Sequence, residues 1–477
     1  MDDQGLDRIF NPRGVALVGA SNDVRKFGNI FFSALLETGA NVYPVNLKKK
    51  KILDRNAYPS VKDIPYDVDY AIISIPLQGI PEVIEDCGKK GVKGVSIYTA
   101  GYGETGTEEG KKREEELAET AKKANVRIIG PNCLGICSPT GKLVFLPGIP
   151  MERGDVGFIS QSGGHAEEFA YEAGSWGIRP SRIVSYGNGC DVSCEELLDY
   201  LVEDPETKVI GIYIEGVEDG RNFLNTLKEA TKRKPVVVWK GGVTEGGGKA
   251  AASHTGSLAG SSKVWEAAIK QSGAIMVNDR DELADQISAI KYLIRPKGRR
   301  VGIVGAGGGA SVASTDVCEM SGLEVPVLEE ETMRKLRGMI PPMGTSVKNP
   351  VDISYFLIFD FPLLKECTEI VAGDEKVDII VAHVSHFDVM VKSIASIVEV
   401  IFETLVETKE IVDGYKKPMA VVLQPGGSTD IEMEKVKLRK RLVEEGMCVF
   451  PSIYRAAKSL ANLAFFANHE NSRYNWR

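Results

Sequence analysis

The sequence lacks an excess of positive charge, since 58 Lys and Arg residues stand against 66 Asp and Glu residues and the net charge is −8. A nucleic-acid-binding protein generally presents a basic face, so the composition argues against that class. No apolar run reaches the ~20 residues that a membrane-spanning helix needs. The amino terminus reads Met1-Asp2-Asp3 and has no apolar signal segment. We therefore expect a cytoplasmic protein without a membrane partner.

The eight cysteines include no Cys-x-x-Cys pair. Cys133 and Cys137 are four residues apart, as are Cys190 and Cys194, but no further ligands at matching spacing accompany them. This pattern does not favour zinc. We expect free, buried or half-buried thiols in a reducing compartment and no metal site.

The sequence is rich in short apolar runs that alternate with glycine turns and helical patterns. Continuous apolar runs predict parallel strands covered on both faces, and interleaved helices predict doubly wound α/β sheets. At ~150 residues each, about three domains fit the length. The predicted domains are 1–147, 148–296 and 297–477. The predicted strands lie at 14–19, 41–45, 70–75, 94–98, 156–159, 182–185, 209–214, 235–239, 301–304, 377–382 and 419–423.

The first predicted strand ends in the turn Gly19-Ala20-Ser21, ahead of a helical pattern. Such a turn exposes N–H groups to a phosphate, although an ordinary strand–helix turn has the same pattern. A dinucleotide site would need Gly-x-Gly-x-x-Gly and an acidic residue after the second strand. The chain instead has Asn46 and then lysines from Lys48 to Lys51. Lysines suit the 3′-phosphate of coenzyme A (CoA) better than a nicotinamide dinucleotide.

Three further strand ends complete the predicted CoA site. The carboxyl ends of parallel strands share one edge of a sheet, so these residues should line the path of the nucleotide and the pantetheine arm. They are Ser74, Ile75, Pro76, Ala100, Gly101, Asn132 and Cys133.

The second block contains a second anion turn, Ser162-Gly163-Gly164, between a strand and a helical pattern at about 166–177. A helix amino terminus attracts a phosphate, and a simple N-cap by Ser162 is compatible with it. Glu215 ends another predicted strand. A carboxylate there can hold one ring nitrogen of a histidine, or it can merely cap the next helix.

His254 is one of only five histidines and stands among small residues, with glycines at 246–248, 256 and 260. Glycine-rich backbone is easily reshaped, and a neutral imidazole is nucleophilic at cellular pH. With the phosphate turns, this predicts a mobile histidine that is transiently phosphorylated; a loop histidine without chemistry is the alternative.

The remaining histidines have weaker claims to a role. His165 adjoins the phosphate turn and could support it. His383 and His386 would point to opposite faces of a strand, so we do not expect them to share a metal. His469 should lie at the surface. In the third block, the turn that contains Gly307 and Gly308 follows a strand and could bind phosphate or simply pack.

Five motifs then occur in order: Gly19-Ala20-Ser21, Tyr43-Pro44-Val45-Asn46, Gly130-Pro131-Asn132-Cys133, Ser160-Gln161-Ser162-Gly163 and Ser253-His254-Thr255-Gly256. With these motifs the chain resembles the α subunits of ADP-forming acyl-CoA synthetases (acetate–CoA ligase, ADP-forming), which are relatives of the succinyl-CoA synthetase α subunit. The resemblance extends over essentially the whole length of the chain. The resemblance implies a Rossmann-like CoA-binding domain followed by two flavodoxin-like ligase domains.

The resemblance also implies a reaction. Phosphate would convert acyl-CoA, of acetate or a similar small acid, into acyl phosphate, and His254 would take the phosphoryl group and pass it to ADP. Ser162 and Gly163 would hold that group, Glu215 would orient His254, and Gly307 with Gly308 would supply a second helix amino terminus. The chain departs from the family at His165, where an apolar residue is usual, and at Ala306, where asparagine is usual.

No segment resembles the ATP-grasp module of the family, so ADP or ATP with Mg²⁺ would bind a partner, an ATP-grasp β subunit in a heterotetramer. Two other interpretations remain open from the residues. One is an NAD(P)-dependent oxidoreductase built on the first block, and the other is a non-catalytic CoA sensor or scaffold.

Overall fold

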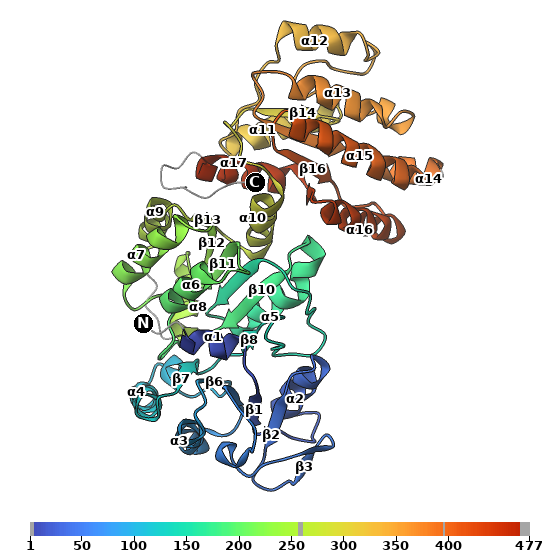
Figure 1. The fold of residues 1–477 in the computed structure, drawn as a ribbon. Coiled ribbons are helices and arrows are strands. Elements are labelled where there is room, and N and C mark those ends of the chain that lie inside the picture. The colour runs from blue at the N-terminus through green and yellow to red at the C-terminus, as the bar shows by residue number, and fades with distance from the viewer. Residues whose placement is uncertain (1–3, 256–260, 395, 468–477) are drawn as a thin grey trace. The chain divides into compact units, whose positions relative to one another are not determined.

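The computed structural model describes residues 4–255, 261–394 and 396–467. Its contacts divide the chain into two compact units. The first comprises Met1–Gly174 with Ile178–Arg280, and the second comprises Ser175–Gly177 with Asp281–Arg477. The predicted α/β class with parallel sheets is confirmed (Figure 1), while the predicted domain boundaries at 147 and 296 stay predictions. Within the described part of the chain, no helix combines the length and apolar character needed to cross a bilayer.

The first sheet of the first unit is entirely parallel, with strand order β2-β1-β5-β6-β7. The direction of the strand order reverses between β1 and β5, and open α/β sheets bind ligands at such a point, outside the carboxyl ends of the strands. The strands are β1 (Val15–Val18), β2 (Val42–Val45), β5 (Tyr70–Ile73), β6 (Gly94–Ile97) and β7 (Arg127–Ile129). The α-helices are α1 (Gln4–Phe10), α2 (Phe27–Glu37), α3 (Ile80–Lys90) and α4 (Glu108–Ala124), and β3 (Lys51–Ile52) and β4 (Arg55–Asn56) form a separate hairpin.

The second sheet has the order β13-β12-β11-β9-β10-β8 and reverses between β9 and β11. Its edge strand β8 runs antiparallel to β10 and was not predicted. The strands are β8 (Gly135–Cys137), β9 (Val156–Ser160), β10 (Pro180–Ser185), β11 (Val209–Ile214), β12 (Val236–Lys240) and β13 (Ile275–Val277). The helices are α5 (Gly163–Glu172), α6 (Cys194–Glu203), α7 (Gly220–Thr231), α8 (Glu245–Thr255) and α9 (Ser262–Ser272).

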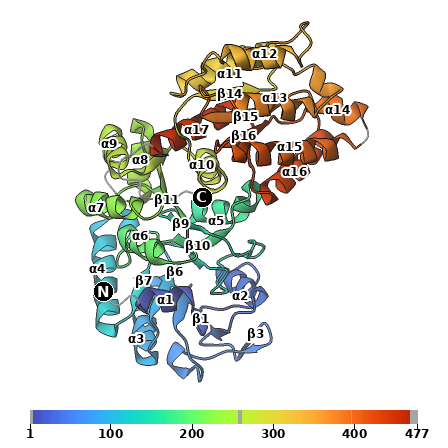
Figure 2. The same ribbon diagram turned by 45° about the horizontal axis from the view of Figure 1, so that its top comes forward.

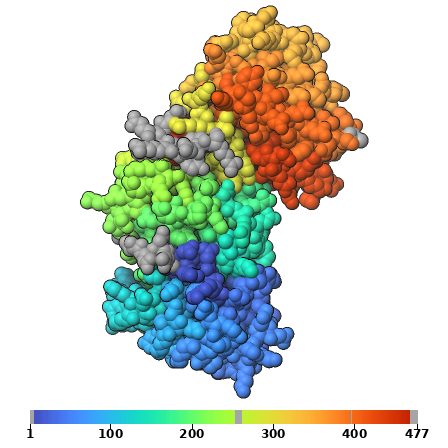
Figure 3. All heavy atoms as spheres, viewed as in Figure 1, coloured from blue at the N-terminus to red at the C-terminus, as the bar shows by residue number. Residues whose placement is uncertain are grey.

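Several contacts join the two sheets of the first unit. The amino-terminal helix α1, dark blue in Figure 3, contacts β6 of the first sheet, and its Phe10 stacks on Tyr200 with ring centroids 4.4 Å apart. Tyr200 belongs to α6, the helix that packs against β9 of the second sheet. Arg127 of β7 forms ion pairs with Asp191 at 3.0 Å and with Glu196 at 2.7 Å. The two sheets are therefore held together by side-chain packing and by shared charge pairs as well as by β8.

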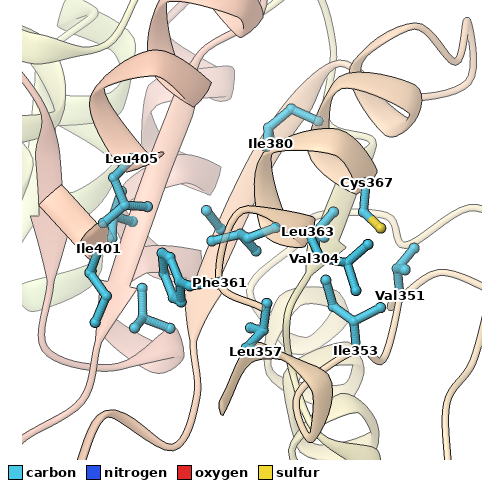
Figure 4. Packing of buried hydrophobic residues seen from close by; sticks show 14 of the residues in the cluster. Val304, Val351, Ile353, Leu357, Phe361, Leu363, Cys367, Ile380, Ile401 and Leu405 are labelled. Carbon is cyan, nitrogen blue, oxygen red and sulfur yellow. The ribbon is translucent and has the colours of Figure 1, made fainter. Parts of the chain in front are cut away.

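The second unit contains one parallel sheet, β14-β15-β16-β17, with helices packed against it (Figure 1 and Figure 2). Val351 bridges to Val304, so the strand order also reverses here, beside β14. Its core is aliphatic and aromatic, and Figure 4 shows Phe361 among the aliphatic side chains of this cluster. The strands are β14 (Val301–Val304), β15 (Ile379–Val384), β16 (Met419–Leu423) and β17 (Cys448–Phe450). The helices are α10 (Arg280–Tyr292), α11 (Gly308–Met320), α12 (Glu330–Arg337), α13 (Leu363–Ala372), α14 (Phe387–Ser393), α15 (Ile397–Gly414), α16 (Thr429–Glu444) and α17 (Ile453–Ala467).

Candidate functional site

The turn after β1 closes tightly on the end of β5. Gly19 has a φ of +93°, and a Cβ there would lie 2.3 Å from the carbonyl oxygen of Ser74, so only glycine fits. The carbonyl oxygen of Ala20 accepts a hydrogen bond from the side-chain amide of Asn46 at 2.8 Å. Ser21 accepts one from the backbone N–H of Asp23 at 3.0 Å. The structure thus brings five predicted CoA residues, which follow three different strands, to one edge of the sheet.

Asn46 also folds the lysine turn. Its Oδ1 atom accepts hydrogen bonds from the backbone N–H groups of Lys48 and Lys49, each at 2.9 Å. The side chain of Lys48 is exposed at this edge of the sheet. An exposed ammonium beside a strand-end turn is the arrangement expected for a second phosphate of a nucleotide.

The next two strand ends extend this edge. The Thr99 hydroxyl donates to the carbonyl oxygen of Ile75 at 2.7 Å, and the Asn132 N–H donates to the carbonyl oxygen of Thr99 at 3.3 Å. Pro76 begins the short turn that follows β5, and the Glu104 carboxylate accepts hydrogen bonds from the N–H groups of Gly101 and Tyr102. These bonds connect the ends of β5, β6 and β7 into one continuous rim, on which Ala100 is exposed. We call the edge from Gly19 to Asn132 the CoA rim, because the sequence predicts that CoA binds there.

Cys133 lies beneath this rim. Its side chain is only 4% exposed, and its thiol donates to the carbonyl oxygen of Ile129 at 3.3 Å. Burial raises the pKa of Cys133 to about 12, so the thiol stays neutral at pH 7. All eight cysteines are free thiols, as the spacing predicts, and seven of them are buried.

The turn at residues 162–164, the second predicted anion site, begins α5 next to the end of the CoA rim. Ser162 is the N-cap of α5, and its hydroxyl accepts a hydrogen bond from the His165 N–H at 3.4 Å. A Cβ on Gly163 would lie 3.4 Å from Leu134, whose own N–H donates to the Ser185 hydroxyl at 3.2 Å. Gly164 is exposed in the first turn of α5. The amino terminus of α5 and the CoA rim are therefore neighbours within one unit.

Gln161 joins this turn to Glu215, a role that was not predicted from the sequence. Its Oε1 atom accepts hydrogen bonds from the N–H groups of Glu215 at 2.7 Å and Gly216 at 3.2 Å. Glu215 is 7% exposed, and its Oε1 atom accepts a hydrogen bond from Tyr213 at 3.0 Å. Lys240 donates to the Glu215 carbonyl oxygen at 2.8 Å. The position of Gln161 inside the Ser-Gln-Ser-Gly motif is the signal that could have revealed it.

His254 belongs to helix α8 rather than to an irregular glycine arm. The Gly247 N–H donates to the Thr244 hydroxyl at 3.0 Å, and Glu245 pairs with Lys249 at 2.8 Å, so local capping and the alanines at 250–252 favour a helix despite the glycines. Helix α8 lies beside the short helix η3 (Gly103–Thr105) of the CoA rim. The side chain of His254 and residues 256–260 lie outside the described residues.

The predicted third-block turn begins α11 in the second unit. Gly307 is the N-cap residue, and a Cβ on it would lie 2.9 Å from the Ser354 hydroxyl. A Cβ on Gly308 would lie 3.6 Å from the Asp352 carboxylate, which accepts a hydrogen bond from Ser354 at 3.0 Å. A carboxylate beside this turn was not anticipated, and the phosphate-binding role of Gly307 and Gly308 stays a prediction.

His383 lies under the same turn, with its side chain 2% exposed. The Ser385 hydroxyl donates to the Gly305 carbonyl oxygen at 2.7 Å, so it must accept from Nδ1 of His383 at 3.0 Å. Nε2 of His383 faces the Gln424 amide at 3.4 Å. Burial lowers the pKa of His383 to about 4. His386 follows in a left-handed conformation, and the described residues contain no cluster of metal-ligating side chains.

Comparison with known proteins places this geometry in a family. Residues 13–139 match a CoA binding domain, and residues 153–290 match a succinyl-CoA ligase like flavodoxin domain. The α subunit of acetate–CoA ligase (ADP-forming) II from Pyrococcus furiosus is 47% identical over 349 residues, which are 73% of this chain and 76% of that protein. The acetate–CoA ligase (ADP-forming) of Methanocaldococcus jannaschii is 39% identical over 74% of this chain and 49% of its own length.

A solved structure is similar over nearly the whole chain. It is the dinucleotide-forming acetyl-coenzyme A synthetase 1 of Ca. Korarchaeum cryptofilum in complex with phosphate and ADP, with 33% identity, a TM-score of 0.83 and 97% coverage of both chains. The resemblance inferred from the ordered motifs is confirmed. The chain belongs to the family of the α subunits of ADP-forming acetate–CoA ligases.

Proposed function

We propose that this chain is the CoA-binding, phosphate-transferring subunit of an ADP-forming acyl-CoA ligase. The enzyme interconverts acyl-CoA, ADP and phosphate with a carboxylic acid, CoA and ATP, and acetate or a similar small acid is the substrate. The observation that carries the proposal is that the Ser162 turn, Glu215 and the helix that bears His254 lie in one unit with the CoA rim. Gln161 ties the Ser162 turn to Glu215, and the helix that bears His254 lies beside the CoA rim.

The proposed reaction has three reversible steps. Phosphate attacks the thioester carbonyl carbon of acyl-CoA, and the C–S bond breaks to release CoA and acyl phosphate. A neutral imidazole nitrogen of His254 attacks the phosphorus, and the carboxylic acid leaves as its anion. The phosphoryl group then passes to ADP.

Each proposed residue has a distinct task in these steps. The N–H groups at Ser162 and Gly163, with the positive end of α5, hold the transferring phosphoryl group. Glu215 accepts a hydrogen bond from one ring nitrogen of His254 and leaves the other nitrogen nucleophilic. The rim from Gly19 to Asn132 holds CoA, with Lys48 near its 3′-phosphate.

The partner is proposed from the lengths of the relatives. The chain covers 76% of a relative named as an α subunit but 49% of a relative named as the ligase itself. This supports a second polypeptide, which we propose to be an ATP-grasp β subunit that binds ADP or ATP with Mg²⁺ in a heterotetramer. The relatives do not favour the oxidoreductase or the CoA sensor.

Incubation of the chain with acetyl-CoA and radiolabelled phosphate tests the proposal. Label should appear on His254, as located by mass spectrometry, and ATP should form only when the partner and ADP are added. His254→Ala should abolish the label, and Glu215→Gln should slow labelling while CoA binding is retained. Undiminished label on His254→Ala would refute the proposal.

A further inference from the structure

Tyr213 of β11 lies directly beside Glu215, the first residue after that strand. Residues i and i+2 of a strand point to the same side, and the Tyr213 hydroxyl donates a hydrogen bond of 3.0 Å to Oε1 of Glu215. Both side chains are almost completely buried, with 6% and 7% exposure. A hydrogen bond to a carboxylate is stronger than a neutral one, especially away from water.

The phenol ring of Tyr213 is confined on three sides. The His165 ring lies against it with centroids 4.4 Å apart, and the Trp239 ring lies 4.5 Å away on the paired strand β12. A Cβ on Gly241 would lie 2.5 Å from the Tyr213 oxygen. Glycine at 241 therefore leaves the space that the hydroxyl occupies, and the surrounding rings prevent the phenol from turning away.

The charges around Tyr213 and Glu215 keep the Tyr213 hydroxyl protonated, so it can donate a hydrogen bond. Burial and the Glu215 carboxylate both raise the pKa of Tyr213, so the phenol is neutral at pH 7. Lys240 donates to the Glu215 main chain rather than to its carboxylate. The Tyr213 hydroxyl thus holds one carboxylate oxygen of Glu215 through its proton.

We propose that Tyr213 is a positioning residue, which holds the Glu215 carboxylate in the orientation that it needs to orient His254. The inference rests on the proposed function, because it gives Tyr213 a task only if Glu215 acts on His254. Tyr213 touches neither the phosphate nor CoA in this scheme. It acts on the rate of phosphorylation through Glu215 alone.

The test is a double-mutant cycle on phosphohistidine formation, measured in single turnovers with acetyl-CoA and radiolabelled phosphate. Tyr213→Phe keeps the ring and removes the hydrogen bond, so phosphorylation should slow about tenfold while the Kd for CoA is unchanged. In the Glu215→Gln background, Tyr213→Phe should cause no further loss. A wild-type rate for Tyr213→Phe, or multiplying effects in the double variant, would overturn the inference.

Gly241→Ala provides a second route to the same answer, and it decides the question if Tyr213→Phe fails to fold. It keeps the Tyr213 hydroxyl but displaces it, because the new Cβ would lie 2.5 Å from the oxygen. Its phosphorylation should slow with CoA binding unchanged, and a wild-type rate would count against Tyr213.

Tyr200→Phe is the matched control. Tyr200 is 7% exposed on helix α6, where its ring stacks on Phe10 of α1. Its loss should leave phosphorylation at the wild-type rate, and equal slowing would reduce Tyr213 to a general stability effect. Failure of the proposed function would look different, since wild type itself would then carry no label on His254.

Discussion

Acid should destabilise the second unit through His383, and a single substitution should remove that sensitivity. The ring is buried under the glycine turn of α11 and is bonded as a neutral imidazole through Ser385 to Gly305. Protonation would place a charge in a site with no carboxylate bonded to the ring. His383→Gln keeps hydrogen-bonding capacity but does not titrate in this range.

The magnitude follows from the two pKa values. The pKa of His383 is about 4 in the folded protein and 6.5 when unfolded, so the unfolded chain binds the proton more tightly. The stabilising contribution is therefore complete above pH 6.5 and is lost as the pH falls towards 4. Between pH 7 and pH 5, wild type should lose about 2 kcal/mol through this group. For a unit of about 200 residues, that corresponds to about 4–8 °C in Tm.

Scanning calorimetry of the full chain at pH 7 and pH 5 provides the measurement. The transition of the second unit should fall by about 4–8 °C less in His383→Gln than in wild type over this interval. His386→Gln is the control, because that side chain is exposed and should leave the acid response unchanged. Equal losses in wild type and His383→Gln would refute the argument from burial.

Three further predictions concern the first unit. Gly28→Ala should weaken CoA binding severalfold, because the new Cβ would lie 2.0 Å from the Gly19 carbonyl oxygen and must deform the turn. Calorimetric titration measures this affinity. Gly5→Ala is the control and should not change it, because no atom lies within 4 Å of a Cβ at that position. Lys48→Ala should lower the affinity for CoA but not for dephospho-CoA, which lacks the 3′-phosphate; an equal loss for both ligands would remove Lys48 from that role. Ser162→Ala should cost about 1 kcal/mol of stability through the lost N-cap and should also slow phosphohistidine formation, and normal labelling would leave Ser162 as a cap alone.

Part of the fold was predictable because it depends on local pattern. The run Val209–Ile214 is apolar at every position, and the structure buries all of it in a sheet covered on both faces. The strand β8 was missed because three residues carry no periodicity of their own, and its pairing depends on β10. Helix α8 was missed because its glycines predict a flexible segment. The helix is instead stabilised by the Thr244 cap and by the ion pair between Glu245 and Lys249.

Some residues of the candidate site were likewise predictable from local sequence, and others were not. Ser162 and Glu215 were predictable as residues at strand ends, since a strand followed by a turn can be recognised in one stretch of sequence. Gln161 and Tyr213 were not predictable as site residues, because their roles depend on hydrogen bonds that only the folded chain forms. Gln161 binds the backbone N–H of Glu215, and Tyr213 binds the Glu215 carboxylate. The depth of Cys133, which was predicted to bind CoA, also depends on strand β6, since the Ile97 carbonyl oxygen lies 3.7 Å from its thiol.

The sequence by itself determined the α/β class, the order of the glycine turns and the family, because apolar runs, glycines and short motifs express local geometry and chemistry along the chain. Only the tertiary structure decided which strand ends adjoin one another at the point where each sheet reverses its order. That outcome depends on hydrogen bonds and packing between residues that are distant in sequence, such as Gly19 with Ser74 and Gln161 with Glu215.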